Sequence, residues 1–240
     1  MWRRDKDCYG LRVEIIGHQQ TLAALKRARE TDAFHHAYLF AGPDGVGKRR
    51  VAEWVAALVN CDEVGAPCGA CRSCHRVLDP EATHPDVLIL EPDGRQITIA
   101  QVRELIRTVP YPPIEATYRV VIIDPADAIG EAAANALLKT LEEPPSKTRF
   151  VLVSSRPDAL LITIRSRCQR ITFGRLTEEQ VLGGLVDAGV ANEDARAMAT
   201  IAGLIERDVG LSAAVLAAAL FTTHLLGLFG SHMIGSEPEA

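Results

Sequence analysis

The chain has 240 residues, of which 48% are hydrophobic and 24% are charged, and its formal net charge is −5. This length and composition are typical of a globular protein with one good-sized domain and a smaller one. A protein that grips DNA through its own phosphate contacts is normally basic, so the charge argues against DNA binding by this chain alone. Four of its six cysteines fall within residues 61–74, which is typical of metal binding in a reducing compartment rather than of a secreted disulfide framework. We therefore expect a cytoplasmic protein.

The ends of the chain carry no targeting signal that can be recognised. No apolar run follows the charged first seven residues, so we expect no signal peptide. Between Gly210 and Gly235 there is no Asp, Glu, Lys or Arg, and by length alone this apolar stretch could span a membrane. Its alanines and glycines, together with Thr222, Thr223 and His224, favour a helix that is buried or packed against a partner. We expect no membrane association.

Apolar residues along the chain alternate between the spacing of helices and the continuous runs of buried strands. The expected elements are, in order, a helix over 19–31, a strand over 37–41, a helix after Lys48, a strand over 87–90, a helix over 99–109, a strand over 120–124, a helix over 131–143, strands over 150–155 and 171–173, and helices over 177–188 and 193–205.

This order predicts an α/β fold. The strand that begins at Val120 is apolar at every position up to its end, as expected when helices cover both faces of a parallel sheet. No strand pattern follows Leu176, so we place a domain boundary near Gly174. The predicted organisation is an α/β domain over 1–174, a small helical domain over 175–209 and a largely apolar tail over 210–240.

A glycine-rich run, Gly-Pro-Asp-Gly-Val-Gly-Lys over 42–48, lies between a predicted strand and a predicted helix, which is the context that a phosphate-binding loop requires. Backbone N–H groups and the helix N-terminus would surround the phosphates, and Lys48 would reach the β and γ groups. Arg49 replaces the hydroxyl residue that would ligate Mg²⁺. The loop is thus a site for ATP or ADP with impaired metal binding, or a vestigial turn. The candidate nucleotide-binding residues here are Gly42, Gly45, Val46, Gly47, Lys48 and Arg49.

An acidic residue ends the strand that begins at Val120. In P-loop ATPases a carboxylate at the end of a neighbouring strand helps to hold Mg²⁺, and Asp124 fits that position. Pro125 follows where many such enzymes carry a glutamate that polarises water, and Asp127 lies at a different offset. Loss of a general base costs about 10²- to 10⁴-fold in rate. We expect a weak or absent ATPase activity.

Cysteines with two-residue gaps form the strongest metal signal in the sequence. The spacing is Cys61-x6-Cys68-x2-Cys71-x2-Cys74, and four thiolates satisfy tetrahedral Zn²⁺ completely. With no open position, the ion would be structural. The alternative is a set of reduced thiols without metal.

Several motifs together resemble the bacterial DNA polymerase III clamp-loader subunits of the AAA+ class, over residues 14 to 175. These motifs are His-His-Ala-Tyr-Leu-Phe over 35–40, the cysteine module, Leu-Leu-Lys-Thr-Leu-Glu-Glu-Pro-Pro over 137–145 and Ser-Arg-Cys over 166–168. The resemblance implies a P-loop fold with an inserted zinc module and a helical lid. It also implies a ring with gamma/tau and delta subunits that uses ATP to open the sliding clamp and place it on primed DNA during DNA replication.

The resemblance also implies roles for single residues. Arg167 would be an arginine finger that reaches the ATP site of a neighbouring subunit, although a plain surface arginine is the alternative in a region that also holds Arg165 and Arg170. Ser155 matches the polar phosphate sensor at a strand end, and Arg207 matches the arginine of the lid.

The combination of Arg49 and Pro125 with a retained Arg167 resembles the delta-prime type of subunit, a stator that activates a neighbour without turning over its own ATP. The alternatives are an active ATPase of the gamma/tau type and a zinc-dependent nucleic-acid-binding protein with an incidental loop. The tail over 210–240 stands where the family implies a collar domain, and residues 230–233 resemble a cloning scar, so we interpret this end as truncated or non-native.

Overall fold

The computed structural model describes most of the chain up to residue 199. The described residues are 15–63, 65–79, 82–187, 190–191, 194–196 and 198–199. The chain divides between Arg175 and Leu176 into two compact units.

The first unit is built on one parallel sheet, whose strands follow the order β2-β3-β4-β1-β5. The strands are β1 (Ala37–Ala41), β2 (Val87–Leu90), β3 (Arg119–Ile123), β4 (Thr148–Ser154) and β5 (Gln169–Thr172).

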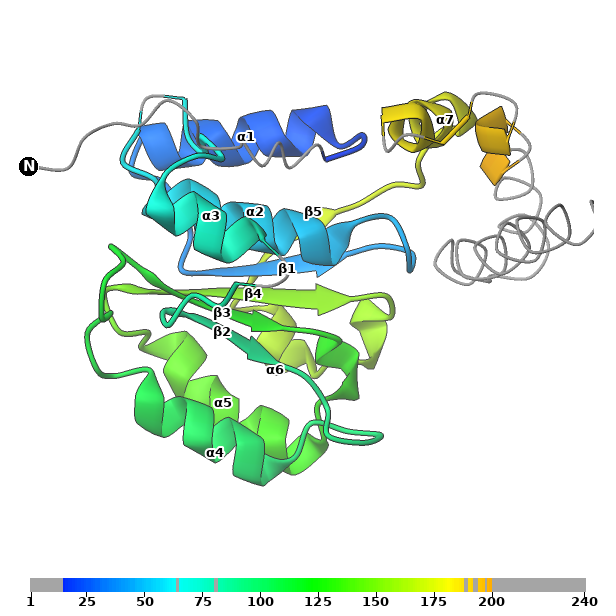
Figure 1. Ribbon diagram of the computed structural model, residues 1–240. Helices are drawn as coiled ribbons and strands as arrows, with labels where there is room; N and C mark the ends of the chain where they lie inside the picture. The colour runs from blue at the N-terminus through cyan, green and yellow to red at the C-terminus, as the bar shows by residue number, and fades with distance from the viewer. Residues whose placement is uncertain are drawn as a thin grey trace, which may run out of the picture. The chain divides into compact units, whose positions relative to one another are not determined.

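Helices cover both faces of the sheet, as Figure 1 shows. On one face lie α1 (Gln19–Glu30), α2 (Lys48–Asn60) and α3 (Arg72–Leu78), and on the other lie α4 (Ile99–Thr108), α5 (Glu131–Glu142) and α6 (Ile162–Arg165). Alternate side chains of β1 supply the two cores: Tyr38 and Phe40 pack with the first group of helices, and Leu39 with the second. The predicted α/β class, with a parallel sheet covered on both sides, is confirmed.

Two short α-helices were not expected from the sequence. α3 lies inside the cysteine module, and it begins where the Cys71 sulfur accepts a hydrogen bond from the backbone N–H of Cys74. α6 spans only four residues, too few for a helical pattern to be recognised.

The common direction of the strands gives the sheet two distinct ends. Residues 42–48 follow β1 and Asp124 follows β3, so both lie at the carboxyl end of the sheet. Residues 34–36 and 166–168 precede β1 and β5 and lie at the amino end. A five-residue strand such as β1 separates the two ends by about 16 Å.

The second unit begins with α7 (Glu178–Asp187), whose first turn is capped by reciprocal hydrogen bonds between Thr177 and Gln180. The tail over 210–240, Arg207 and much of the helix expected over 193–205 lie outside the described residues. Among the helices that the structure describes, none combines the length and the apolar character needed to cross a bilayer.

Candidate functional site

The glycine-rich loop joins β1 to α2 at the carboxyl end of the sheet. Gly45 has a φ of 77° and Gly47 a φ of 91°, both in the left-handed region that glycine adopts without strain. Gly47 is also the residue immediately before the first turn of α2, so the loop delivers the chain directly to the helix N-terminus. This is the backbone arrangement that lets a loop and a helix N-terminus face a phosphate.

Gly42 is needed for a different reason, which the sequence did not reveal. A Cβ atom on Gly42 would lie 2.4 Å from the backbone oxygen of Phe173 and 2.9 Å from its Cβ. Phe173 itself is buried and donates its backbone N–H to the carbonyl of Ala41 at 2.7 Å. The start of the loop is therefore pressed against the segment that leaves β5.

Replacing Gly42 by alanine should destabilise the protein by about 3 kcal/mol, because an atom must be inserted against a backbone group that cannot rotate away. Chemical denaturation measures this change. Gly94→Ala is the matched control, since a Cβ at Gly94 meets nothing within 4 Å, and it should change stability by less than about 1 kcal/mol. Equal stability of the two variants would contradict the close approach at Gly42.

Lys48 is folded back onto its own loop. Only 5% of the residue is exposed, and its Nζ donates to the carbonyl of Gly42 at 2.8 Å and to that of Pro43. Burial lowers the pKa of Lys48, and the nearby carboxylates of Asp44, Asp124 and Asp127 oppose that change. The ammonium group of Lys48 thus already lies at the loop, where it donates to two carbonyl groups. Phosphate oxygens could take the place of these carbonyls as acceptors.

Arg49 makes the most informative contacts at this end of the sheet. Its Nη1 atom donates to Asp124 Oδ2 at 3.1 Å and to Glu91 Oε1 at 2.7 Å. Its Nε atom donates to Glu53 Oε1 at 3.0 Å. Arg49 and Asp124, two residues predicted separately for the candidate nucleotide site, are brought together across 75 positions of sequence. Their pairing was not predicted, and Glu91 and Glu53 were missed. Glu53 lies four residues after Arg49 on a helix, so its spacing could have identified it.

The acidic strand end is therefore occupied by a protein cation. Burial raises the pKa of the Asp124 carboxyl, and the hydrogen bond from Arg49 opposes this rise. Pro125 follows through a cis peptide bond and brings no acid or base group. A metal ion at Asp124 would have to compete with the guanidinium for the same carboxylate oxygens.

Asp127, the nearest acidic residue after Pro125, is committed to structural contacts. Its Oδ1 atom accepts from Ser154 Oγ at 2.7 Å and from the Ser155 backbone N–H at 3.3 Å, and its Oδ2 atom accepts from Arg156 at 3.0 and 3.2 Å. Burial alone would raise the pKa of Asp127, but the bonds from Ser154 and Arg156 outweigh it and lower the pKa. A carboxylate held in this way is a weak base, so it does not replace the missing glutamate.

The same contacts place Ser155, the residue predicted as a phosphate sensor. β4 ends at Ser154, which is fully buried and whose hydroxyl donates a hydrogen bond to Asp127. Ser155 follows it and has a half-buried side chain. Ser155 therefore lies at the carboxyl end of the sheet, as the sequence predicted. Its backbone is positioned by Asp127, a contact that the sequence analysis did not foresee.

The four clustered cysteines converge on one point. Their Sγ atoms all lie within 4.8 Å of one another, with Cys61 and Cys74 buried and Cys68 and Cys71 half-buried. Around a zinc ion with Zn–S bonds of about 2.3 Å, sulfur atoms are about 3.8 Å apart, so the cluster fits such an ion after a small contraction. None of the five cysteines in the described part of the chain forms a disulfide.

Local hydrogen bonds favour a thiolate at the open side of the cluster. Burial raises the pKa of the Cys68 thiol, but backbone N–H groups of Ala70 and Cys71 outweigh it and lower the pKa to about 7. A thiolate is the form that binds metal. A donor set of four sulfurs fills the tetrahedral coordination of zinc and leaves no open position, which suits a structural ion.

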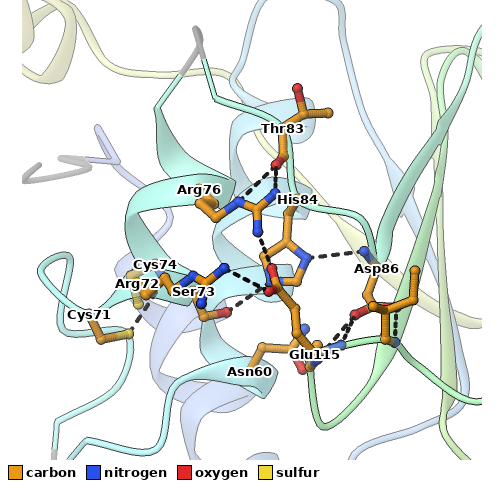
Figure 2. Close-up of polar contacts among 12 residues, drawn as sticks. Asn60, Cys71, Arg72, Ser73, Cys74, Arg76, Thr83, His84, Asp86 and Glu115 are labelled. Carbon is orange, nitrogen blue, oxygen red and sulfur yellow. Dashed lines mark hydrogen bonds and ion pairs between the residues drawn. The ribbon is translucent and has the colours of Figure 1, made fainter. Parts of the chain in front are cut away.

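The cysteine module is anchored to the sheet by a polar network, shown in Figure 2. Arg72 and Arg76 of α3 both pair with Glu115, and Ser73 lies 3.4 Å from Nε2 of the buried His84. His84 Nδ1 in turn accepts from the backbone N–H of Asp86 at 3.1 Å. Because these partners precede β2 and β3, α3 is held at the amino end of the sheet.

Asp86 is the centre of this anchor. The residue is fully buried, and its carboxylate accepts backbone N–H bonds from residues 114, 115 and 116 at 2.7, 2.9 and 3.0 Å. Arg119 approaches it at 3.4 Å. Burial raises the pKa of Asp86, but these donors outweigh it and lower the pKa. Asp86 was not among the residues predicted from the sequence, although a lone acidic residue at the start of an apolar strand is a recognisable signal.

Arg167 lies at the amino end of the sheet, opposite the phosphate loop. It precedes β5, whose first residue Gln169 is paired with Tyr38 near the start of β1. The guanidinium pairs with Glu142 and donates to the carbonyl of Thr163 at 2.7 Å. It lines an open depression of about 460 Å³ together with His35, His36, Leu141, Glu142 and Ser166. The length of the sheet thus separates Arg167 from the loop of its own chain.

A model of the protein family described as "DNA polymerase III, delta subunit" matches residues 17–177, more than half of the chain. The chain belongs to this family. The match within the DNA polymerase III delta-subunit family includes the phosphate loop, the cysteine module and Arg167, and it ends just after the first compact unit.

Curated proteins of two kinds are similar to this member of the delta-subunit family. The delta-prime subunit of DNA polymerase III from Bacillus subtilis (strain 168) is 37% identical over 194 residues, which cover 80% of this chain and 58% of that protein. The delta-prime subunit from Pseudomonas aeruginosa is 44% identical, covering 65% of this chain and 47% of that protein. The tau subunit from Bacillus subtilis (strain 168) is 36% identical over a match that covers 71% of this chain and 30% of that protein. The chain therefore spans between 30% and 58% of the length of these relatives.

Proposed function

We propose that this chain is a stator subunit of the DNA polymerase III clamp loader. It does not hydrolyse its own nucleotide efficiently, and it supplies Arg167 to the ATP site of a neighbouring subunit during loading of the sliding clamp onto primed DNA. The observation that carries the proposal is the position of Arg167, at the end of the sheet opposite the phosphate loop. From there the partly exposed guanidinium lies too far from the glycine-rich loop of its own chain to serve it, so an ATP site that it serves would belong to another chain.

The weakness of the chain's own hydrolytic site supports the same proposal. Asp124 is paired with Arg49, so the usual carboxylate for Mg²⁺ is already occupied. Pro125 offers no general base, and Asp127 is held by Ser154 and Arg156. Two independent defects, in metal binding and in water activation, lower the rate of hydrolysis together.

The remaining features fit a cytoplasmic assembly. Zinc held by the four cysteines would hold the cysteine module, which includes α3, at the end of α2 without taking part in the chemistry. Gamma/tau and delta subunits would be the direct partners in a hetero-oligomeric ring. The sliding clamp and primed DNA would be reached through that ring, because a chain with a net charge of −5 is a poor independent DNA binder.

A motor of the gamma/tau type is the second candidate. It is favoured by the retained Lys48 and Asp124 and by the 36% identity to a tau subunit. The two candidates differ in what the isolated chain does with ATP, because a motor carries its own catalytic groups and a stator does not.

ATP hydrolysis by the purified chain distinguishes the two candidates. We expect the purified chain to hydrolyse ATP only at the background rate in the presence of Mg²⁺, and Lys48→Ala should not change that rate. ATP hydrolysis should rise above background only when a tau-type partner, the clamp and primed DNA are added. Turnover by the chain alone that Lys48→Ala abolishes would replace the stator with the motor. If the chain assembled with no polymerase III partner, both the stator and the motor would be contradicted.

A further inference from the structure

Arg49 ties the first turn of α2 to the ends of two neighbouring strands. Glu91 follows β2 and Asp124 follows β3, and the Arg49 guanidinium bridges them at 2.7 and 3.1 Å. Glu53, one turn further along α2, fixes the other side of the guanidinium at 3.0 Å. Three elements therefore hold one positive charge beside the phosphate loop.

The first turn of α2 is also unusually basic. Lys48, Arg49 and Arg50 follow one another, and the turn contains no acidic residue. A helix N-terminus carries partial positive charge, so cations there are unfavourable unless an anion is present. Glu53, Glu91 and Asp124 offset the charges of Arg49 and Arg50, whereas the Lys48 ammonium is bound by loop carbonyls. The ammonium, the helix N-terminus and the left-handed glycines of the loop together suit a polyanion such as the phosphate chain of a nucleotide.

A divalent cation is poorly accommodated at the same place. Mg²⁺ requires oxygen ligands at about 2.0–2.1 Å in octahedral geometry. The residue after Lys48 presents a guanidinium where such sites present a hydroxyl, and the Asp124 carboxylate already accepts from that guanidinium. An ion bound here would lose both ligands and would lie against a like charge.

We propose that the phosphate loop of this chain takes a nucleoside diphosphate or triphosphate without a divalent cation, with Arg49 in the place of that cation. Lys48 and the loop N–H groups hold the terminal phosphates. The guanidinium, fixed by Asp124 and Glu91, supplies the positive charge that Mg²⁺ supplies at ordinary sites of this kind. The proposal concerns the carboxyl end of the sheet and is independent of the role of Arg167 at the amino end.

Calorimetric titration of the full chain with ATP tests this proposal, once in excess MgCl₂ and once in excess EDTA. The wild-type affinity should change by less than about threefold between the two buffers. Arg49→Thr restores a hydroxyl beside Lys48 and frees Asp124, so its affinity should become about tenfold or more stronger in MgCl₂ than in EDTA. Arg49→Lys keeps a positive charge and serves as the matched control. Its affinity for ATP should differ by no more than about threefold between MgCl₂ and EDTA.

Two results for the wild-type chain would overturn the proposal: binding that requires Mg²⁺, and no ATP binding in either buffer. An Arg49→Thr variant that melts like the wild type and binds equally in both buffers would overturn the role of Arg49. If that variant does not fold, Arg49→Ala decides the same point. It removes the charge and should lose about tenfold or more of its affinity in EDTA.

Discussion

Replacing Arg167 by alanine should lower ATP turnover at the neighbouring subunit's site by about a thousandfold or more and leave this chain folded. A guanidinium offers planar, bidentate contacts to the γ-phosphate in the transition state and stays charged, which no shorter side chain reproduces. In the structure its side chain is 31% exposed and is held by Glu142 and a backbone carbonyl, so its removal opens no core cavity. ATP hydrolysis by a complex reconstituted with a tau-type partner, clamp and primed DNA measures the effect.

Arg165→Ala is the matched control for this experiment. Arg165 is the last residue of α6, two positions before Arg167; its side chain is 30% exposed, and it pairs with Asp158 at 2.6 Å. We expect its replacement to change partner turnover by less than about twofold, since a paired surface arginine contributes little. Unchanged turnover in Arg167→Ala would remove the finger assignment. Equal losses in both variants would point to a general effect of surface charge.

Removing the metal, or one of its ligands, should have the largest effect on stability. Replacing the buried Cys74 by serine should abolish binding of one zinc ion per chain and lower the free energy of unfolding by about 4 kcal/mol or more. The cluster closes the segment between α2 and α3, and a bound ion would add four metal–sulfur bonds to the weaker hydrogen bonds that link these cysteines. Metal analysis and chemical denaturation, with and without a strong chelator, measure both quantities.

Cys168→Ala is the control for cysteine loss outside the cluster. Cys168 is buried, belongs to no metal group in the described part of the chain, and burial raises the pKa of its thiol to about 12. The variant should retain full zinc content and lose stability only through the lost sulfur. Full zinc content in Cys74→Ser, or stability unaffected by the chelator, would contradict a structural ion.

Local patterns in the sequence predicted most of the first unit. The run from Val120 to Ile123 is apolar at every position because both faces of β3 are covered, and a short stretch of residues suffices to show this. Short helices were not predicted, because a seven-residue helix such as α3 has too few turns for its period to be recognised. The start of α3 also depends on a cap by a cysteine side chain.

Sequence patterns could not indicate which distant residues meet at the candidate site. Arg49 was predicted to impair metal binding, but its partners Glu91 and Asp124 are 42 and 75 positions away. Their contact depends on β2 and β3 ending side by side in the sheet. Gly42 was assigned to phosphate binding, whereas its closest constraint comes from Phe173, more than a hundred residues later in the chain.

Short-range patterns were enough to identify the residue types at the candidate sites: a glycine-rich loop without its hydroxyl residue, an acidic strand end without its glutamate, four cysteines at zinc spacing and the Ser-Arg-Cys motif. Each of these features consists of residues close together in the sequence, so the covalent chain keeps them near one another in any fold. The positions of the two arginines depend on long-range packing: Arg49 lies against Asp124, and Arg167 lies at the far end of the sheet from the glycine-rich loop of its own chain. The order and direction of the strands set both positions, and these arise from packing between segments far apart in the chain.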